Sequence, residues 1–145
     1  MTTILYVEDR PSILNIVAEK LELAGYDVLT ATNIEDAVRL FKSDRPDIMV
    51  LDYRLMDNVT GIKSDTIQFL KKLGDARANI PALMLSATPL HVIKAENPDF
   101  DKFNLEFMTK KNKFEVDSMV IVDKIRDMLR ATRPIINSAG GSKSL

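Results

Sequence analysis

The sequence predicts an α/β protein with one open, doubly wound sheet of five parallel strands flanked by helices. Three observations carry this prediction. The hydrophobic pattern switches repeatedly between short apolar runs and longer segments with helical spacing. Runs such as 48–51 are apolar without alternation, which indicates strands that are buried on both faces. The chain has 145 residues, 46% of them hydrophobic, which suits one domain with a sizeable core.

The first half of the chain contains three strand–helix units. The expected strands are 4–7, 26–31 and 48–51, and the expected helices are 11–24, 33–41 and 64–73, with a loop at 53–61. Pro11 suits the first turn of a helix, and Asn33 can cap the second helix. Gly25 and Gly74 stand where the first and third helices are expected to end.

The second half is less regular. Strands are expected at 82–85 and 105–109, and a final helix at 116–131. The segment 89–104 contains two prolines and leaves room only for a short helix at 91–96, so the fourth helix is expected to be weak or atypical. We therefore expect one domain over residues 1–132, followed by a flexible tail at 133–145.

Composition excludes several classes of function. A formal net charge of −1 disfavours a protein that binds nucleic acid directly through phosphates. The absence of cysteine excludes disulfides, cysteine zinc sites, iron–sulfur clusters and thiol nucleophiles, and the single histidine, His91, excludes a histidine-rich metal site. No apolar run approaches the ~20 residues of a membrane span, and the first residues are acidic where a signal peptide is basic. We expect a cytoplasmic protein without membrane insertion.

Polar and charged residues follow four of the expected strands. Glu8 and Asp9 follow the first strand, Asp52 the third, Ser86 the fourth and Lys110 the fifth. Ligands of open parallel sheets bind outside the carboxyl ends of the strands, so we expect these side chains to converge there.

This set of side chains suits phosphoryl transfer. Clustered carboxylates repel one another unless a cation joins them, and Mg²⁺ prefers oxygen ligands. Asp52 is then available as a carboxylate nucleophile toward phosphorus, giving an acyl phosphate. The ammonium of Lys110 and the hydroxyl of Ser86 can contact further phosphoryl oxygens.

Each residue also has a simpler explanation. Glu8 and Asp9 could cap the helix that begins near Pro11, since acids suit a helix N-terminus. Lys110 could be an ordinary surface lysine, and Ser86 could satisfy a backbone group of its own loop. The joint pattern favours the functional interpretation, because capping explains one acid but not two acids beside Asp52 and Lys110.

Four segments together resemble the receiver domain of response regulators in two-component signalling: ILYVEDR, IMVLDYRLMD, LMLSAT and FMTKKNKF. Their order and spacing extend the resemblance over residues 1 to about 131. The loop DYRLMDNVTG is similar to a variant that is frequent among hybrid kinases. The resemblance implies a flavodoxin-like fold and a signalling switch whose partners are a sensor histidine kinase or a phosphotransfer protein, together with an output protein that the sequence does not identify.

The resemblance also implies roles for individual residues. Asp52 would accept a phosphoryl group from a phosphohistidine, and the protein would catalyse its own phosphotransfer and slow hydrolysis. Glu8 and Asp9 (Asp9 more directly), Asp52 and the backbone carbonyl of Arg54 would bind Mg²⁺, with Mn²⁺ as an alternative. Lys110 would pair with the phosphoryl group. Ser86 would be the switch hydroxyl, and Phe107 the switch aromatic.

The chain departs from the family in two loops. Lys111 stands where the family has a proline with a cis bond, so the loop after Lys110 is expected to be strained or rearranged. Met56 replaces a usual proline, and Asn58 stands where loop-variant members often have glycine.

Two other functions stay open. One is a pseudo-receiver, an interaction module that is regulated by partner binding without phosphorylation. The other is a small phosphatase with an aspartate nucleophile, which Arg54 disfavours because a second carboxylate would be expected at that position.

Overall fold

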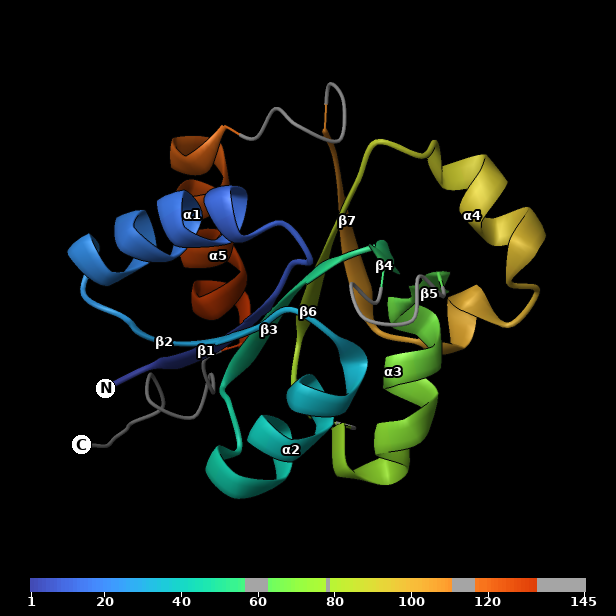
Figure 1. Cartoon of the computed structure of the whole chain (residues 1–145), viewed down its shortest axis with the longest axis horizontal. Helices are drawn as coiled ribbons and strands as arrows, with labels where there is room; N and C mark the ends of the chain where they lie inside the picture. The colour runs from blue at the N-terminus through green and yellow to red at the C-terminus, as the bar shows by residue number, and fades with distance from the viewer. Residues whose placement is uncertain (57–62, 78, 111–116, 133–145) are drawn as a thin grey trace, which may run out of the picture.

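Five strands form one parallel sheet at the centre of the protein (Figure 1). They are β1 (Thr3–Val7), β2 (Asp27–Ala31), β3 (Ile48–Asp52), β6 (Ala82–Ser86) and β7 (Leu105–Thr109). The structure is a computed structural model that describes residues 1–56, 63–77, 79–110 and 117–132. The strand order is β2-β1-β3-β6-β7, so the winding direction changes between β1 and β3. Open sheets of this kind bind ligands at that position.

Helices cover both faces of the sheet (Figure 1). They are α1 (Pro11–Leu23), α2 (Ile34–Asp44), α3 (Thr66–Leu73), α4 (Leu90–Glu96) and α5 (Ser118–Thr132), with 3-10 turns η1 (Gly74–Arg77) and η2 (Phe100–Lys102). Side chains of α1 and α5 pack on one face, and side chains of α2 and α3 pack on the other. The predicted doubly wound fold is confirmed. Among the described helices, none combines the length and apolar character that crossing a membrane requires.

The middle strands are buried on both faces, as their unalternated sequences predict. Leu5 and Val7 of β1 belong to the core on the α2–α3 side, whereas Ile4 and Tyr6 belong to the core on the α1–α5 side. All residues of β3 and β6 are buried. The edge strands β2 and β7 are partly exposed.

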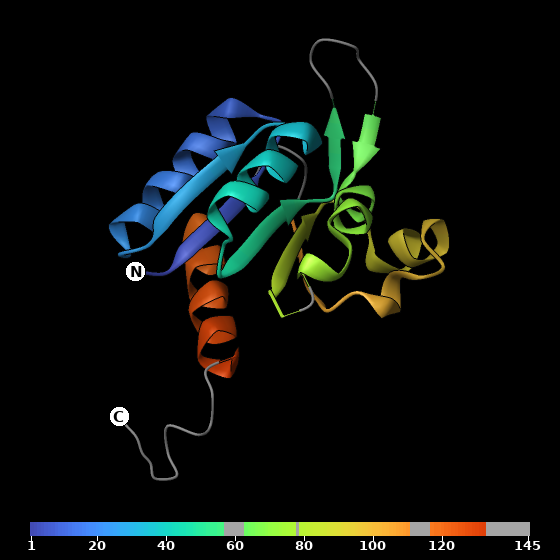
Figure 2. The same cartoon turned by 90° about the horizontal axis from the view of Figure 1, so that it is seen from below.

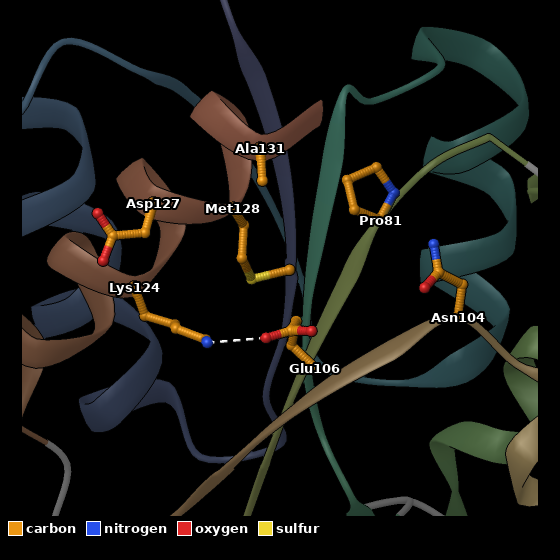
Figure 3. Close-up of a pocket in the computed structure, with 7 residues that line it drawn as sticks. All are labelled: Pro81, Asn104, Glu106, Lys124, Asp127, Met128 and Ala131. Atoms are coloured by element: carbon orange, nitrogen blue, oxygen red, sulfur yellow. Dashed lines mark hydrogen bonds and ion pairs between the residues drawn. The ribbon is translucent and has the colours of Figure 1, made fainter. Parts of the chain in front are cut away.

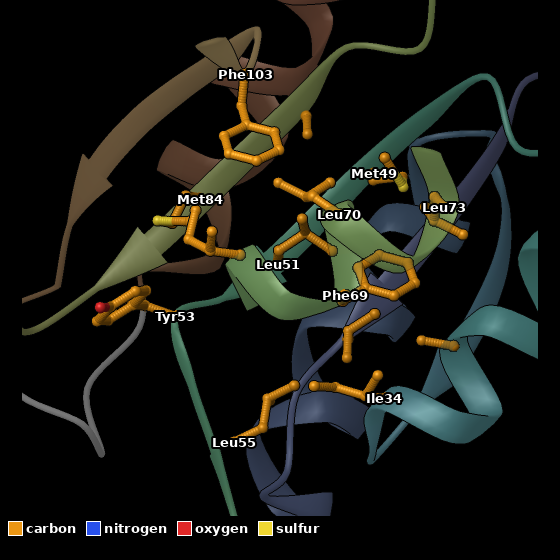
Figure 4. Close-up of a cluster of buried hydrophobic side chains, with 14 of the residues drawn as sticks. Ile34, Met49, Leu51, Tyr53, Leu55, Phe69, Leu70, Leu73, Met84 and Phe103 are labelled. Atoms are coloured by element: carbon orange, nitrogen blue, oxygen red, sulfur yellow. The ribbon is translucent and has the colours of Figure 1, made fainter. Parts of the chain in front are cut away.

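The larger core joins α3 to the sheet. Figure 4 shows Phe69, Leu70 and Leu73 of α3 in one cluster with Met49 and Leu51 of β3. Burial of each such side chain contributes about 1.5–3 kcal/mol. Because α3 has only eight residues, packing rather than intrinsic helix propensity stabilises it.

Three predicted helix ends are confirmed. Pro11 occupies the first turn of α1, where its missing N–H costs nothing. Gly25 follows α1 with a φ of 100°, a backbone conformation that glycine adopts without steric penalty. Asn33 caps α2, since its Oδ1 accepts a hydrogen bond of 2.8 Å from the backbone N–H of Asp36. The α2 helix continues to Asp44 rather than ending near residue 41, where its apolar pattern stops.

Replacing Asn33 by alanine should lower the free energy of unfolding by about 1 kcal/mol, because the N–H of Asp36 loses its acceptor. Asn33→Ser keeps a side-chain oxygen at the cap and should retain most of the stability. Urea unfolding of both variants measures the difference. Equal stability of the alanine variant and the wild type would show that this cap contributes nothing measurable.

The expected loop at 53–61 is wrong for its first residues. Residues Arg54–Met56 form strand β4, which pairs antiparallel with β5 (Lys63–Asp65). Figure 2 shows this pair projecting beyond the end of the parallel sheet. The third helix therefore begins at Thr66 rather than at Ser64.

The burial of the side chains after Asp52 alternates, which explains why this segment forms a strand of the hairpin. Tyr53 and Leu55 are buried, and Arg54 between them is exposed, which is the alternation of a strand. A strand of three residues is too short for this alternation to be distinguished from a loop in the sequence. Met56 is the last residue of β4, and Asn58 lies outside the described residues.

The fourth helix is short, as predicted. The α4 helix has seven residues and is followed by η2. Ile93, Phe100 and Phe103 are buried in the core on the α2–α3 side. Side-chain burial therefore anchors this segment, although it contains little helix.

Candidate functional site

Three carboxylates meet at the carboxyl edge of the sheet. The strands β1 and β3 are neighbours with Val7 opposite Leu51, so Glu8 and Asp52 lie at the same level. Glu8, Asp9 and Asp52 each offer one carboxylate oxygen, and these oxygens lie within 4.8 Å of one another. Glu8 is 0% exposed and Asp52 is 4% exposed. The predicted convergence of these acids is confirmed.

Lys110 lies inside this cluster. Its Nζ donates a hydrogen bond of 2.7 Å to Asp52 Oδ1 and lies 3.8 Å from Glu8 Oε1. The backbone N–H of Lys110 donates to the carbonyl oxygen of Ser86 at 2.8 Å, which anchors the end of β7 to the end of β6. Lys110 is 6% exposed, so the alternative of an ordinary surface lysine is wrong. The Lys110–Lys111 bond lies at the edge of the described residues, and the expectation about its geometry falls outside them.

Arg10 is a second cation beside the acids, and strand-end reasoning missed it. Its backbone N–H donates to Glu8 Oε2 at 3.1 Å. Its guanidinium lies 3.9 Å from Glu8 Oε2 and 3.9 Å from Asp9 Oδ1. The sequence did contain a signal for this role, because Arg10 directly follows Glu8 and Asp9 and a basic side chain there can screen both carboxylates.

Burial dominates the electrostatics of the carboxylates. It raises the pKa of Glu8 to about 8, with a further contribution from the charge of Asp52 and an opposing one from Lys110. Burial also raises the pKa of Asp52, and Lys110 offsets part of that rise. Glu8 Oε1 accepts no hydrogen bond from the described residues. Buried carboxylates with an oxygen left over fit a hard divalent cation such as Mg²⁺.

Tyr6 places a phenol next to the acids from within the core. Its side chain is buried, and its hydroxyl has no hydrogen-bond partner among the described residues. Burial raises the pKa of Tyr6, and the charges of Glu8 and Asp52 raise it further. The phenol is therefore neutral at the edge of the site.

The two expected switch residues lie on β6 and β7. Ser86 is buried, and its Oγ donates to the carbonyl of Thr88 at 3.0 Å and accepts from the N–H of Thr88 at 2.8 Å. Its hydroxyl is thus turned onto its own loop. Phe107 is half-buried in β7 and packs against the core on the α2–α3 side.

A second polar cluster joins the residues after Asp52 to the end of α4. Tyr53 Oη donates to Glu96 Oε1 at 2.8 Å and accepts from Asn97 Nδ2 at 2.9 Å. Arg54 Nη2 donates to both carboxylate oxygens of Glu96, at 2.7 and 2.9 Å. The guanidinium of Arg54 lies 5.1 Å from the centre of the Tyr53 ring. Sequence reasoning missed this cluster, because Glu96 is 42 residues from Arg54 and no motif connects them.

A pocket of about 260 Å³ lies elsewhere, between β7 and α5 (Figure 3). It is lined by Pro81, Asn104, Glu106, Lys124, Asp127, Met128 and Ala131. Lys124 Nζ donates to Glu106 Oε1 at 2.8 Å across it. None of the strand-end residues lines this pocket, so it is not part of the acidic site.

The family comparison agrees with the geometry of the site. The model of the family described as "Response regulator receiver domain" matches residues 4–116. These residues include the three carboxylates, Ser86 and Lys110.

Curated relatives match over different lengths. The PhoP regulator of alkaline phosphatase synthesis from Bacillus subtilis is 35% identical over 99 residues, which is 68% of this chain and 35% of the relative. The "DNA-binding dual master transcriptional regulator RpaA" of Synechocystis is 32% identical over 145 residues, which is 100% of this chain and 56% of the relative. The chain therefore spans about a third to a half of the length of these relatives.

Solved structures show the same fold. The receiver domain of the Francisella response regulator 1452 has a TM-score of 0.72 at 21% identity, covering 92% of this chain and 100% of that domain. The response regulator TrrA of Thermotoga maritima, in complex with Mg(2+)-BeF, has a TM-score of 0.66 at 21% identity, with coverage of 92% and 100%.

Proposed function

The chain belongs to the response regulator receiver domain family, and we propose that it is a phosphorylation-dependent signalling switch with Asp52 as phosphoacceptor. One observation carries the proposal: Asp52 is a buried carboxylate that holds the Lys110 ammonium at 2.7 Å beside two acids of β1. That arrangement supplies a nucleophile, a fixed positive charge and a set of oxygen ligands in one place.

The reaction forms one bond and breaks one bond. A carboxylate oxygen of Asp52 attacks the phosphorus of a phosphohistidine on the partner, the phosphorus–nitrogen bond breaks, and the imidazole leaves with the electron pair. Glu8, Asp9, Asp52 and the backbone carbonyl of Arg54 would hold Mg²⁺ or Mn²⁺. The bound cation would neutralise charge on the phosphoryl oxygens.

Lys110 and Ser86 change partners in this proposal. The Lys110 ammonium, now bonded to Asp52 Oδ1, contacts a phosphoryl oxygen once Asp52 is modified. The Ser86 hydroxyl leaves Thr88 and donates to another phosphoryl oxygen. Phe107, half-buried on the neighbouring strand, then repacks and changes the partner-binding surface of the domain.

The proposed partners are a sensor histidine kinase or phosphotransfer protein and a separate output protein, in the cytoplasm. The receiver of the hybrid histidine kinase CckA shares the fold at a TM-score of 0.65. DNA binding belongs to RpaA as a whole, of which this chain spans 56%, and we propose no direct contact with nucleic acid here. We assign the receiver to residues 1–132 and a tail to 133–145.

A pseudo-receiver that is regulated by partner binding alone is the second candidate. The observation in its favour is the Ser86 hydroxyl, which bonds twice to the backbone of Thr88 in its own loop. The retained acids and Lys110 favour the phosphorylated switch.

Incubation with acetyl phosphate and Mg²⁺ should add one phosphoryl group, measured by intact mass, and Asp52→Asn should abolish the addition. Asp127→Asn, at an exposed position on α5, is the matched control and should be modified like the wild type. Thermal melting establishes that both variants are folded. An Asp52→Asn variant that is still modified would move the acceptor elsewhere, and a wild type that is never modified would favour the pseudo-receiver.

A further inference from the structure

We propose that Glu96 is a positioning residue for the metal site, because it fixes Tyr53 and Arg54 and thereby links occupancy of the acidic cluster to the end of α4. The inference rests on the proposed function, since it takes the backbone carbonyl of Arg54 as a metal ligand. Glu96 itself lies on α4 and acts through the two residues that follow Asp52.

The backbone of Tyr53 is fixed on both sides. Its N–H donates to the carbonyl of Leu85 at 3.0 Å, and its carbonyl accepts from the N–H of Thr66 at 3.0 Å. Its side chain is 1% exposed. The path of the chain out of Asp52 is therefore set by β6 and α3, and the next residue, Arg54, pairs with Asp65 of β5.

Glu96 adds a tether from α4, because its carboxylate accepts three hydrogen bonds from the side chains of Tyr53 and Arg54. Two come from Arg54 Nη2 and one from the hydroxyl of Tyr53. An exposed ion pair by itself contributes little, but this carboxylate is also held by a buried phenol. The hydrogen bonds from Arg54 and Tyr53 also lower the pKa of Glu96.

The same bonds define the C-terminal end of α4. Asn97 is buried, and its Nδ2 donates both to Tyr53 Oη and to the carbonyl of Ile93, each at 2.9 Å. The last turn of this seven-residue helix thus closes on the residue next to the phosphoacceptor. Figure 1 shows α4 on the same side of the protein as α3, opposite α1 and α5.

Coupling of this kind is reciprocal. If Glu96 stabilises the backbone position that binds Mg²⁺, then Mg²⁺ stabilises the last turn of α4 by the same factor. Mg²⁺ affects α4 only if it binds more tightly when the last turn of α4 is ordered than when it is not. Binding of Mg²⁺ should therefore slow amide exchange at residues 93–97 in the wild type.

The test compares Mg²⁺ affinity and amide exchange in Glu96→Ala and Asp101→Asn, both without a phosphodonor. Asp101 forms an exposed ion pair of 3.3 Å with Lys94 of α4 and takes no part in the hydrogen bonds that Tyr53 and Arg54 make to Glu96, so its variant is the matched control. Glu96→Ala should weaken Mg²⁺ binding about tenfold, at the low end of the 10–100-fold range for residues that orient metal ligands. It should also remove the slowing of exchange at residues 93–97, and Asp101→Asn should change neither result.

Two further variants separate positioning from folding. Tyr53→Phe keeps the buried ring but removes the hydroxyl, and Glu96→Gln keeps an acceptor without the charge, so both should show intermediate Mg²⁺ affinity. If the wild type binds Mg²⁺ and Glu96→Ala binds it equally well, the inference is wrong while the proposed function stands. If the wild type shows no Mg²⁺-dependent amide shifts at all, both are overturned.

Discussion

Replacing Lys110 by methionine should lower the free energy of unfolding by about 3–5 kcal/mol at pH 7, because it removes one partner of a buried ion pair. Methionine has a comparable length and no charge, so the loss reports the ammonium rather than a cavity. Asp52 and Glu8 are both buried, and among the residues that the structure describes Arg10 would be the cation left beside them. Urea unfolding measures the effect as a lower midpoint at an unchanged slope.

A second substitution identifies the cause of the loss. In the double variant Lys110→Met/Asp52→Asn the buried carboxylate is neutral as well, so at least half of the lost stability should return. Lys102→Met, at an exposed lysine of η2, is the control and should change the stability by about 0.5 kcal/mol or less. A Lys110→Met variant that is as stable as this control would mean that the 2.7 Å contact contributes nothing to folding.

The sheet could be predicted from the sequence because burial on both faces leaves a local signature. Ile48-Met49-Val50-Leu51 has no polar position, and the corresponding strand is buried throughout. The position of the acidic site could be predicted from the same arrangement of strands. Once parallel strands are placed side by side, Glu8, Asp52 and Lys110 have to meet at one edge.

Contacts that depend on tertiary placement could not be predicted in this way. The segment 89–104 has no strong period, so nothing in it indicates that Glu96 reaches back to Tyr53. The β4 strand is too short for its alternation to be significant. A serine hydroxyl can bond either to a loop backbone group or to a ligand, and only the folded structure shows that the hydroxyl of Ser86 bonds to Thr88.

Without Mg²⁺, the protein should lose stability as the pH rises from about 5 to about 8. The pKa of Glu8 rises from 4.5 in the unfolded chain to about 8 in the folded protein. Between these pH values the folded state therefore holds a proton that the unfolded state has released. The contribution of Glu8 to the free energy of unfolding is complete below pH 4.5 and is lost as the pH passes about 8. At roughly 1.4 kcal/mol per pKa unit, the loss amounts to a few kcal/mol.

Mg²⁺ should reverse this trend, because a cation held by the deprotonated carboxylates would displace the proton of Glu8. The increase in melting temperature caused by millimolar Mg²⁺ should accordingly be larger at pH 8 than at pH 6. Glu8→Gln carries no titrating group at this position, so its stability should depend much less on pH in this window and its Mg²⁺ affinity should fall. Glu19→Gln, at an exposed position of α1, should behave like the wild type. If Glu8→Gln kept the wild-type loss of stability between pH 5 and 8, the titrating group would lie elsewhere, and Asp52, whose pKa burial also raises, would be the next carboxylate to replace.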